Sequence, residues 1–418
     1  MKRIIVIFLC LIFLSGCTFN MYPEDSSEAV KSAITEATGE NTNADYGYIK
    51  SVWLAYFEIQ DLLSGCDEMQ FSSRINEKFT KLKKMGFNTV TVQVRAFADA
   101  IYPSKYFPPS PYCPSDNGSL KFDVFKIICN AAKKNGFNVE AWINPYRIQN
   151  TSDIKKLNKS SVALKWLGSE KKKSNVYVNE KGVYFNPASN DVTKLIVNGV
   201  KEIVENYNVS AVHFDDYFYP TVKRDIDKAE YKKYKDKGGK LALSSWRREN
   251  INNMVKSVYK AVKKCNKKVK FGISPASDMK RNKNELYADV EKWVSHKGYI
   301  DYICPQVYFG FLNVYQPFMF TVKKWMYISK CDIYIGLPLY KSGKADKYAA
   351  KEDKKIINEF INNNNIIARQ ITYLSKLEDI KGFYIFSFSS IFDKDKEGEV
   401  NNMLKAMQSS NPQLHRKN

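Results

Sequence analysis

The sequence lacks the residue patterns from which small metal and dinucleotide sites are usually built. Its three histidines, His213, His296 and His415, are far apart, and none of its eight cysteines forms a C-x-x-C pair. Zinc ligands normally come in closely spaced pairs, so no metal site is expected. No G-x-G-x-x-G segment follows the first predicted strand, which argues against an open, dinucleotide-binding sheet. We therefore expect a protein without a cofactor.

The apolar run at the N-terminus is too short for a membrane span. Lys2 and Arg3 precede an apolar segment at 4–14, and Leu14-Ser-Gly-Cys17 follows it. This layout is typical of a signal peptide, and the last four residues resemble a bacterial lipobox. We expect residues 1–17 to be a lipoprotein signal in which Cys17 is lipidated, placing the protein on the extracytoplasmic face of the cell membrane. The alternative is an ordinary secretory signal with a chance cysteine.

Charge of one sign dominates the chain, which carries a formal net charge of +21 over 418 residues. A basic surface suits polyanions such as nucleic acid, anionic lipid or acidic cell-wall polymers, and a cell-surface location argues against nucleic acid. Solvated lysine-rich helix faces are the simpler explanation of the charge. Residues 18–48 are polar and predict a flexible tether, which leaves 49–410 for the folded domain. The sequence does not indicate an oligomeric state.

From residue 49 onward a short apolar strand, a loop and an amphipathic helix recur eight times. The clearest helices are predicted at 191–206 and 245–264, where apolar residues fall on one stripe. Eight such units predict an α/β fold, a (β/α)8 TIM barrel with enlarged βα loops. The predicted strands are 50–57, 88–95, 138–144, 209–215, 269–274, 300–308, 332–339 and 381–388.

A barrel requires alternate strand residues to be apolar where they face the surrounding helices. The second strand fits, with Val90, Val92 and Val94 outward and Thr91, Gln93 and Arg95 inward, and the third, fourth, sixth and seventh strands follow the same rule. The inward polar residues gather toward the carboxyl ends of the strands, where barrel enzymes carry their active sites. Glu140 lies deeper, and we expect it to pair with Arg95 or His213.

The strand at 209–215 ends in two adjacent carboxylates, Asp215 and Asp216. Strand parity predicts that Asp215 faces the barrel axis beside His213 and that Asp216 begins the loop. Adjacent strand residues point apart, so the two need not form a working pair. Glu58 at the tip of the first strand and Asp278 after the fifth are the other candidates for a partner. A loop cap, or an ion pair with a nearby arginine, is the structural alternative for the two aspartates.

Several segments at the predicted strand ends carry a resemblance to a known family. Over roughly 49–395 the chain resembles the glycoside hydrolase-like family 10. Where that family often has Ser-Pro-Phe-Gly after the fifth strand, this chain has Ser274-Pro-Ala-Ser-Asp278. The matching segments are Ser51-Val-Trp-Leu-Ala-Tyr56, Val92-Gln-Val-Arg95, Ala141-Trp-Ile-Asn-Pro-Tyr-Arg147, His213-Phe-Asp-Asp-Tyr217, Trp246-Arg-Arg-Glu-Asn-Ile251, Gly272-Ile-Ser-Pro275, Pro305-Gln-Val-Tyr308 and Ile335-Gly-Leu-Pro-Leu-Tyr340.

The resemblance implies an envelope-associated barrel related to hydrolases of peptidoglycan glycan strands, with its site at the barrel mouth. Glycoside hydrolysis usually needs two carboxyl groups, so the catalytic candidates are Asp215, Asp216 and Glu58. Arg247 is predicted to meet a substrate carboxylate, with a helix-surface ion pair as the alternative, and Trp142 is assigned to packing. The predicted substrate-binding residues are Arg95, Asn144, Tyr146, Arg147, Tyr217, Arg247, Asp278, Gln306, Tyr308 and Tyr340.

The resulting hypothesis is a surface-anchored glycosidase that uses carboxylate acid–base catalysis on peptidoglycan or related amino-sugar glycans. A glycan-binding barrel lipoprotein without catalysis is the alternative. A surface lipoprotein that binds polyanions ranks third, because it rests on net charge alone.

Overall fold

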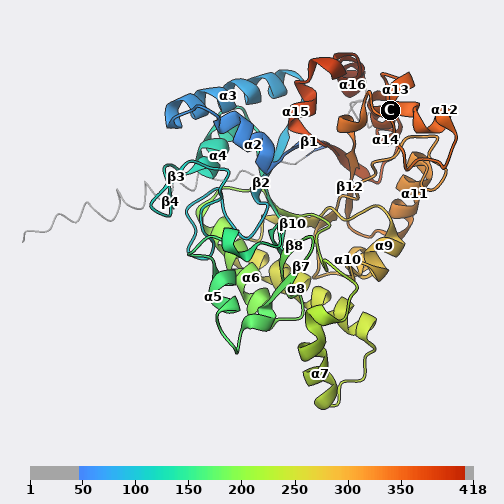
Figure 1. The fold of residues 1–418 in the computed structure, drawn as a ribbon. Helices are drawn as coiled ribbons and strands as arrows, with labels where there is room; N and C mark the ends of the chain where they lie inside the picture. The colour runs from blue at the N-terminus through green and yellow to red at the C-terminus, as the bar shows by residue number, and fades with distance from the viewer. Residues whose placement is uncertain (1–46, 410–418) are drawn as a thin grey trace, which may run out of the picture. The chain divides into compact units, whose positions relative to one another are not determined.

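The computed structural model describes residues 47–409, shown in Figure 1. The predicted signal peptide at 1–17, its Cys17 and nearly all of the predicted tether lie outside the described residues, as do residues 410–418. Within 47–409, no helix is long and apolar enough to cross a membrane.

Eight parallel strands close into a barrel, which confirms the predicted fold class. Their order around the barrel is β1-β13-β12-β11-β10-β9-β5-β2, so that β2 closes on β1. Each strand overlaps a predicted one. The bounds are β1 Ile49–Leu54, β2 Thr89–Arg95, β5 Asn138–Ile143, β9 Ala211–Phe214, β10 Lys270–Ile273, β11 Tyr302–Ile303, β12 Asp332–Leu337 and β13 Ile380–Ile385.

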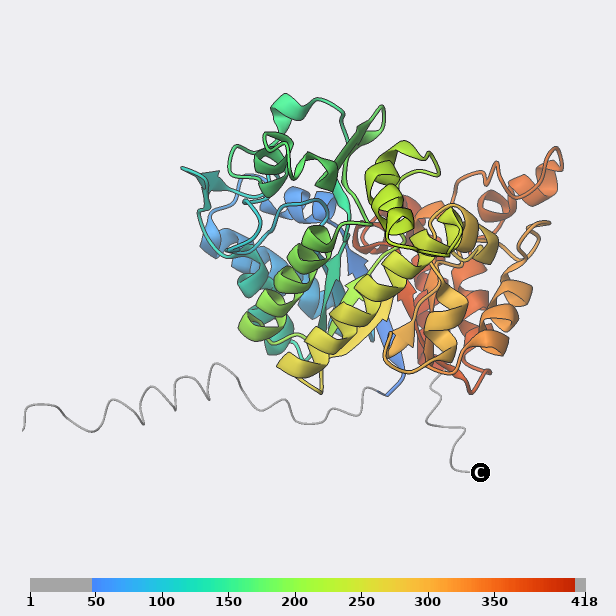
Figure 2. The same cartoon turned by 90° about the horizontal axis from the view of Figure 1, so that it is seen from below.

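Helices surround the barrel, and α6 and α8 lie side by side across it (Figure 2). Both match predicted helices, and Ser189 caps α6 by accepting a hydrogen bond from the Val192 amide. The helices are α2 Tyr56–Leu63, α3 Glu68–Lys84, α4 Val124–Lys134, α5 Val162–Leu167, α6 Asn190–Asn206, α7 Lys228–Asp236, α8 Leu243–Cys265, α9 Met279–Asn284, α10 Val290–Ser295, α11 Phe318–Ile328, α12 Lys354–Ile357, α13 Glu359–Asn362, α14 Ile366–Leu374, α15 Phe388–Ile391 and α16 Glu397–Ser409.

Several βα connections are enlarged, as the sequence predicts. The connection after β2 holds the hairpin β3–β4 (Ser115–Asp116, Ser119–Leu120). The connection after β9 holds α7. The connection after β5 holds α5 and a three-stranded sheet of β6 Arg147–Gln149, β8 Gly182–Phe185 and β7 Val176–Asn179. These insertions supply part of the wall around the barrel mouth.

The apolar core has two parts, separated by the barrel wall. The outer part packs the strands against the helices and includes Val90, Val92 and Val94, as strand parity predicts. The inner part fills the barrel with aromatic rings. They include Trp53, Trp142, Tyr302, Tyr334 and Tyr384. An interior filled in this way is a packed core rather than a channel, which confines any ligand to the mouth.

Arg95 departs from the predicted parity. The register between β2 and β5 shifts between Gln93 and Arg95, and this irregularity turns the Arg95 side chain outward. Its guanidinium lies 3.6 Å from the centre of the Phe107 ring and is fully buried. A Cβ atom on Gly199 of α6 would stand 2.5 Å from Arg95 Nη1, so the glycine makes room for this side chain. The predicted inward orientation of Arg95 is therefore wrong.

Glu140 lies deep inside the barrel, and hydroxyl groups rather than Arg95 satisfy it. Thr91 Oγ1 donates a hydrogen bond of 2.9 Å, and the Tyr384 hydroxyl donates one of 2.8 Å. His213 Nδ1 is 3.8 Å away, but burial lowers the pKa of His213 to about 3, so the ring is neutral. Burial also raises the pKa of Glu140 to about 7. The predicted ion pair is replaced by a polar network.

Candidate active site

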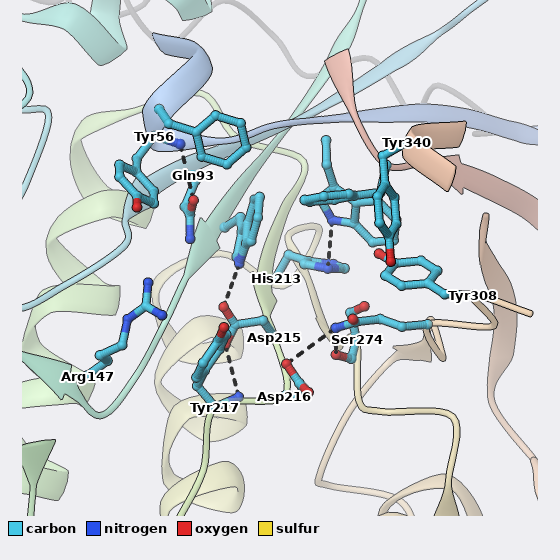
Figure 3. Close-up of a pocket in the computed structure, with 15 residues that line it drawn as sticks. Tyr56, Gln93, Arg147, His213, Asp215, Asp216, Tyr217, Ser274, Tyr308 and Tyr340 are labelled. Carbon is cyan, nitrogen blue, oxygen red and sulfur yellow. Dashed lines mark hydrogen bonds between the residues drawn. The ribbon is translucent and has the colours of Figure 1, made fainter. Parts of the chain in front are cut away.

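A pocket of about 350 Å³ opens at the carboxyl ends of the barrel strands, as strand parity predicts. Figure 3 shows Asp215 and Asp216 between Arg147 on one side and Tyr308 and Tyr340 on the other. The volume suits one or two sugar rings. The lining residues are Trp53, Tyr56, Phe57, Gln93, Trp142, Arg147, His213, Asp215, Asp216, Tyr217, Ser274, Gln306, Tyr308, Tyr340 and Phe386.

Asp215 follows directly after β9 and is 3 % exposed. Trp142 Nε1 donates a hydrogen bond of 3.0 Å to Oδ2, and the Tyr217 amide donates one of 3.3 Å to Oδ1. Burial, and then the neighbouring charge of Asp216, raise the pKa of Asp215 to about 7. These effects outweigh the two hydrogen bonds and the attraction of Arg147, all of which favour the ionised form. Asp215 can therefore hold a proton near neutral pH.

Asp216 is the second carboxylate of the pocket, and it is more exposed than Asp215. Gln306 Nε2 lies 3.5 Å from its Oδ1 and donates a better bond of 3.0 Å to the Ser274 carbonyl. Burial raises the pKa of Asp216 too, but Arg281, Gln306 and Arg147 oppose the rise. Because two neighbouring carboxylates share one site, the less exposed Asp215 takes the proton and Asp216 keeps the charge.

The floor of the pocket is fixed by His213. The indole Nε1 of Trp53 donates to His213 Nε2 at 3.3 Å, and His213 Nδ1 lies 2.9 Å from the Tyr302 hydroxyl. An indole nitrogen only donates, so Nε2 must be the acceptor and Nδ1 carries the ring proton. His213 is not among the groups that shift the pKa of Asp215. The structure therefore supports a satisfied core histidine rather than a group that tunes the pKa of Asp215.

Aromatic rings form the wall opposite Arg147. Tyr308 and Tyr340 meet edge to face with ring centres 5.8 Å apart, and Phe386 packs 6.0 Å from Tyr308. Ring faces of this kind stack on the apolar faces of pyranose sugars. Tyr217, on the other side, is 46 % exposed and offers a further ring at the rim.

Seven of the thirteen predicted catalytic and binding residues meet in this pocket. They are Arg147, Asp215, Asp216, Tyr217, Gln306, Tyr308 and Tyr340.

Glu58 and Asp278, the two other candidates for the partner of Asp215, do not line the pocket. Glu58 is 2 % exposed, and its carboxylate accepts bonds from the Ala55 amide, the Ser387 hydroxyl and the Ser389 amide. Asp278 caps α9 by accepting from the amides of the next turn. Both carboxylates accept hydrogen bonds from backbone amides. The prediction of a catalytic Glu58 and a substrate-binding Asp278 is therefore corrected. Of the three candidates for the partner, Asp216 is the one that lines the same pocket as Asp215.

Arg247 is likewise occupied. It is fully buried and holds both oxygens of Asp227 at 2.7 Å, and it also donates to the carbonyls of Val222 and Lys223. The bidentate partner predicted for it exists, but it belongs to the protein instead of a substrate. The alternative of an ion pair is the correct one, although the pair is buried rather than on the helix surface.

The remaining predicted residues, Arg95, Asn144 and Tyr146, lie outside the pocket wall. Asn144 supports the site indirectly, because its Oδ1 accepts a hydrogen bond of 3.2 Å from the Arg147 amide. The Tyr146 ring packs in the outer core. The predicted substrate contacts of these three residues are therefore corrected to structural roles.

Sequence reasoning missed other residues of the wall. Trp142 was assigned to packing, yet its indole holds Asp215. Gln93 was expected inside the barrel, and its inward parity was the available signal; it lines the pocket and accepts a bond of 3.1 Å from the Tyr56 amide. Tyr56 and Phe57 lie at the start of α2, where no alternation marks them. Among residues 47–409, no group of three or more His, Cys, Asp or Glu residues is placed to hold a metal ion.

Comparison with known proteins places this site in a family. The model of the family described as "Glycosyl hydrolase-like 10" matches residues 48–353. The chain belongs to the glycosyl hydrolase-like 10 family. This membership confirms the expected resemblance and supports the prediction that the protein is a glycosidase.

Curated relatives agree with this assignment, and a solved structure agrees with the fold. The chain is 33 % identical over 339 residues to glycosyl hydrolase YngK of Bacillus subtilis, covering 74 % of this chain and 62 % of YngK. It is 29 % identical to glycosyl hydrolase DigH of Escherichia coli K12, covering 74 % of each chain. In fold it resembles alpha-L-fucosidase isoenzyme 2 from Paenibacillus thiaminolyticus, with a TM-score of 0.55, 12 % identity, and coverage of 89 % of this chain and 50 % of that one. The chain thus spans less than two thirds of the length of YngK.

Proposed function

We propose that this protein hydrolyses glycosidic bonds in peptidoglycan or related amino-sugar glycans, with Asp215 as the proton donor. The observation that carries the proposal is a buried carboxyl group beside a second carboxylate in a pocket at the barrel mouth, where burial and the neighbouring charge raise its pKa to about 7. A glycosidase needs a general acid of this kind, with a raised pKa, to protonate the leaving oxygen.

In the proposed reaction the Asp215 carboxyl gives its proton to the glycosidic oxygen as the bond to the anomeric carbon breaks. Positive charge then develops on the sugar ring, and the ionised Asp216 stabilises it. The oxygen of a water molecule then forms the new bond to the anomeric carbon, and one proton of that water passes to the Asp215 carboxylate, which restores the acid. The Trp142 indole stabilises the Asp215 carboxylate once the proton has left, because it bonds to Oδ2 at 3.0 Å.

Amino-sugar substrates fit this arrangement because they bring a reactive group of their own. In substrate-assisted glycosidases the 2-acetamido group attacks the anomeric carbon, so a second carboxylate across the scissile bond is not needed. Asp215 and Asp216 are the two carboxylates that line the described pocket, and they are adjacent in sequence. One can protonate the leaving group while the other orients the acetamido group.

The alternative of a glycan-binding barrel without catalysis is less well supported. It expects an inward carboxylate without a partner, whereas Asp216 lines the same pocket as Asp215. A pure binding site also has no need of a carboxyl group whose pKa is raised to about 7.

Release of reducing ends from purified glycan strands by the full-length protein tests the proposal. We expect turnover by the wild-type protein and its loss in Asp215→Asn. An Asp215→Asn variant with undiminished turnover refutes the assignment of Asp215. Saturable glycan binding without turnover by the wild-type protein, across amino-sugar polymers, supports the binding-barrel alternative instead.

The proposal includes a lipid anchor at Cys17 that holds the enzyme on the outer face of the membrane. Its support is the sequence of residues 1–17, in which a basic start and an apolar segment precede Leu14-Ser-Gly-Cys17. Labelled palmitate should be incorporated into the wild-type protein but not into Cys17→Ala. An unlabelled wild-type protein refutes the anchor and leaves the glycosidase proposal untouched.

A further inference from the structure

We propose that Arg147 is the receptor for a carboxylate on the glycan, so that the preferred substrate carries acidic sugars. Lactyl-substituted amino sugars and uronic acids share this chemistry. The inference rests on the proposed function, because it names the substrate class of the same pocket.

The Arg147 guanidinium is held in place, and its Nε–H lacks an acceptor. Its carbon Cζ lies 4.4 Å from the centre of the Phe97 ring and 4.6 Å from that of Tyr217, so the group packs against two aromatic rings. Its Nε atom is buried and has no hydrogen-bond partner. Within residues 47–409, no carboxylate oxygen lies within 4.0 Å of its nitrogens.

A partly desolvated guanidinium with a buried N–H that has no acceptor is costly to the free protein. A ligand that supplies the acceptor relieves this cost, and a carboxylate does so best, because its two oxygens match the planar fork of N–H donors and its charge is opposite. A sugar hydroxyl satisfies one donor but leaves the charge unpaired. Contacts with two rings also restrict the orientation of the fork before the substrate arrives.

The location points to the sugar beside the scissile bond. Arg147 and Asp215 line the same pocket, and Tyr217, which stacks on Arg147, also donates its backbone amide to Asp215. Figure 3 shows Arg147 across the pocket from Tyr308 and Tyr340. A glycan whose ring lies over the acids therefore brings a ring substituent to Arg147.

Binding should be measured by titration calorimetry in the full-length Asp215→Asn background, which prevents turnover. The first ligand is a tetrasaccharide of alternating amino sugars with lactyl carboxylates, and the second is the same tetrasaccharide with each carboxyl reduced to an alcohol. A tetrasaccharide of uronic acids forms a third arm that separates the two sources of carboxylate.

We expect a carboxylate-bearing ligand to bind roughly tenfold to a hundredfold more tightly than the reduced one, the range for a hydrogen-bonded charge pair. Arg147→Gln should bring this ratio close to one, and Arg147→Lys should keep part of it, with stronger sensitivity to salt. Arg281→Gln is the matched control, because Arg281 also acts on Asp216 by its charge but does not line the pocket. In Arg281→Gln, the ratio of affinities for the acidic and the reduced ligand should equal that of the Asp215→Asn background.

The inference is overturned if the ratio is near one in the parent, if neither acidic ligand binds, or if Arg147→Gln keeps the ratio. An equal loss in Arg147→Gln and Arg281→Gln also overturns it, because a general charge effect then explains both. The proposed function fails separately, if the wild-type protein releases no reducing ends while the carboxylate preference persists.

Discussion

Arg147 and Arg247 each contact two aromatic rings, yet they differ in the hydrogen-bond acceptors around their guanidinium groups. The Arg247 guanidinium lies 5.1 Å from the Tyr219 ring centre and 5.0 Å from that of Tyr287, and it donates to Asp227, two carbonyls and the Tyr287 hydroxyl. Arg147 has comparable rings, but its buried Nε lacks any acceptor and its side chain faces a pocket.

Asp227 and Asp215 differ in the same way, in how completely their carboxylates are paired. Asp227 has Arg247 on both oxygens and the Tyr219 hydroxyl as well, so it is a satisfied structural charge. Asp215 has no cation within 4.0 Å in the described chain, and its pKa rises to about 7. A buried charge with a complete set of partners stabilises the fold, whereas one with an incomplete set beside a pocket is available for chemistry.

The largest expected effect concerns the pocket acid. Asp215→Asn should lower kcat about 10²- to 10⁴-fold, because the amide cannot supply the proton but can still accept the Trp142 bond. Initial rates of reducing-end release measure the loss. Asp278→Asn is the control, since asparagine caps a helix as well as aspartate does, and its rate should stay near that of the wild type.

The buried ion pair should respond in stability instead. Arg247→Met leaves Asp227 uncompensated, and we expect a loss of about 3–5 kcal/mol in the free energy of unfolding. Denaturant titration at neutral pH measures the change. The neighbouring Arg248→Met, which removes only a partly exposed contact with Ser245, should cost about 0.5 kcal/mol or less. Equal losses in the two variants contradict the assigned role of Arg247.

Asp215→Asn should raise the free energy of unfolding, whereas Arg247→Met lowers it, and the gain should be smaller than that loss. Because the folded-state pKa of Asp215 is raised, its neutral form is favoured in the fold, and the wild type loses stability as pH rises from about 4 toward 7. Asparagine does not titrate. The variant should therefore be more stable than the wild type at pH 8, on the order of 2 kcal/mol, with the gain shrinking at pH 4. A gain that is independent of pH contradicts this origin.

The smallest effect is the pH dependence of activity. If Asp215 acts in its protonated form, kcat/KM should fall about tenfold per pH unit above pH 7. Asp216→Asn removes the neighbouring negative charge that raises the pKa of Asp215. In the activity that this variant retains, the fall in kcat/KM should therefore begin at a lower pH. A limb that stays in place after this substitution assigns the titration to another group.

The barrel strands and the position of Asp215 could be predicted from the sequence. Periodicity located all eight barrel strands, and strand parity turned Asp215 inward, because both depend on local alternation between apolar and polar residues. The irregular register at Gln93 and Arg95 broke the alternation by a single residue and moved an arginine from the axis to the helix layer. Parity cannot foresee such a shift.

The other misplaced residues depended on contacts between distant segments. Glu58 is bound by Ser387 and Ser389, and Arg247 by Asp227, Val222 and Lys223. Which charged side chain finds a partner inside the protein is decided only when the loops fold together. Trp142 was overlooked for the related reason that a buried tryptophan reads as packing until the position of its N–H is known.

The central claim is that Asp215 keeps a proton near neutral pH, and a carboxyl titration tests it most directly. The full-length protein labelled with ¹³C at aspartate Cγ should show one resonance that is absent in Asp215→Asn and titrates with a midpoint near pH 7. A midpoint near 4, the ordinary value for aspartate, contradicts the account.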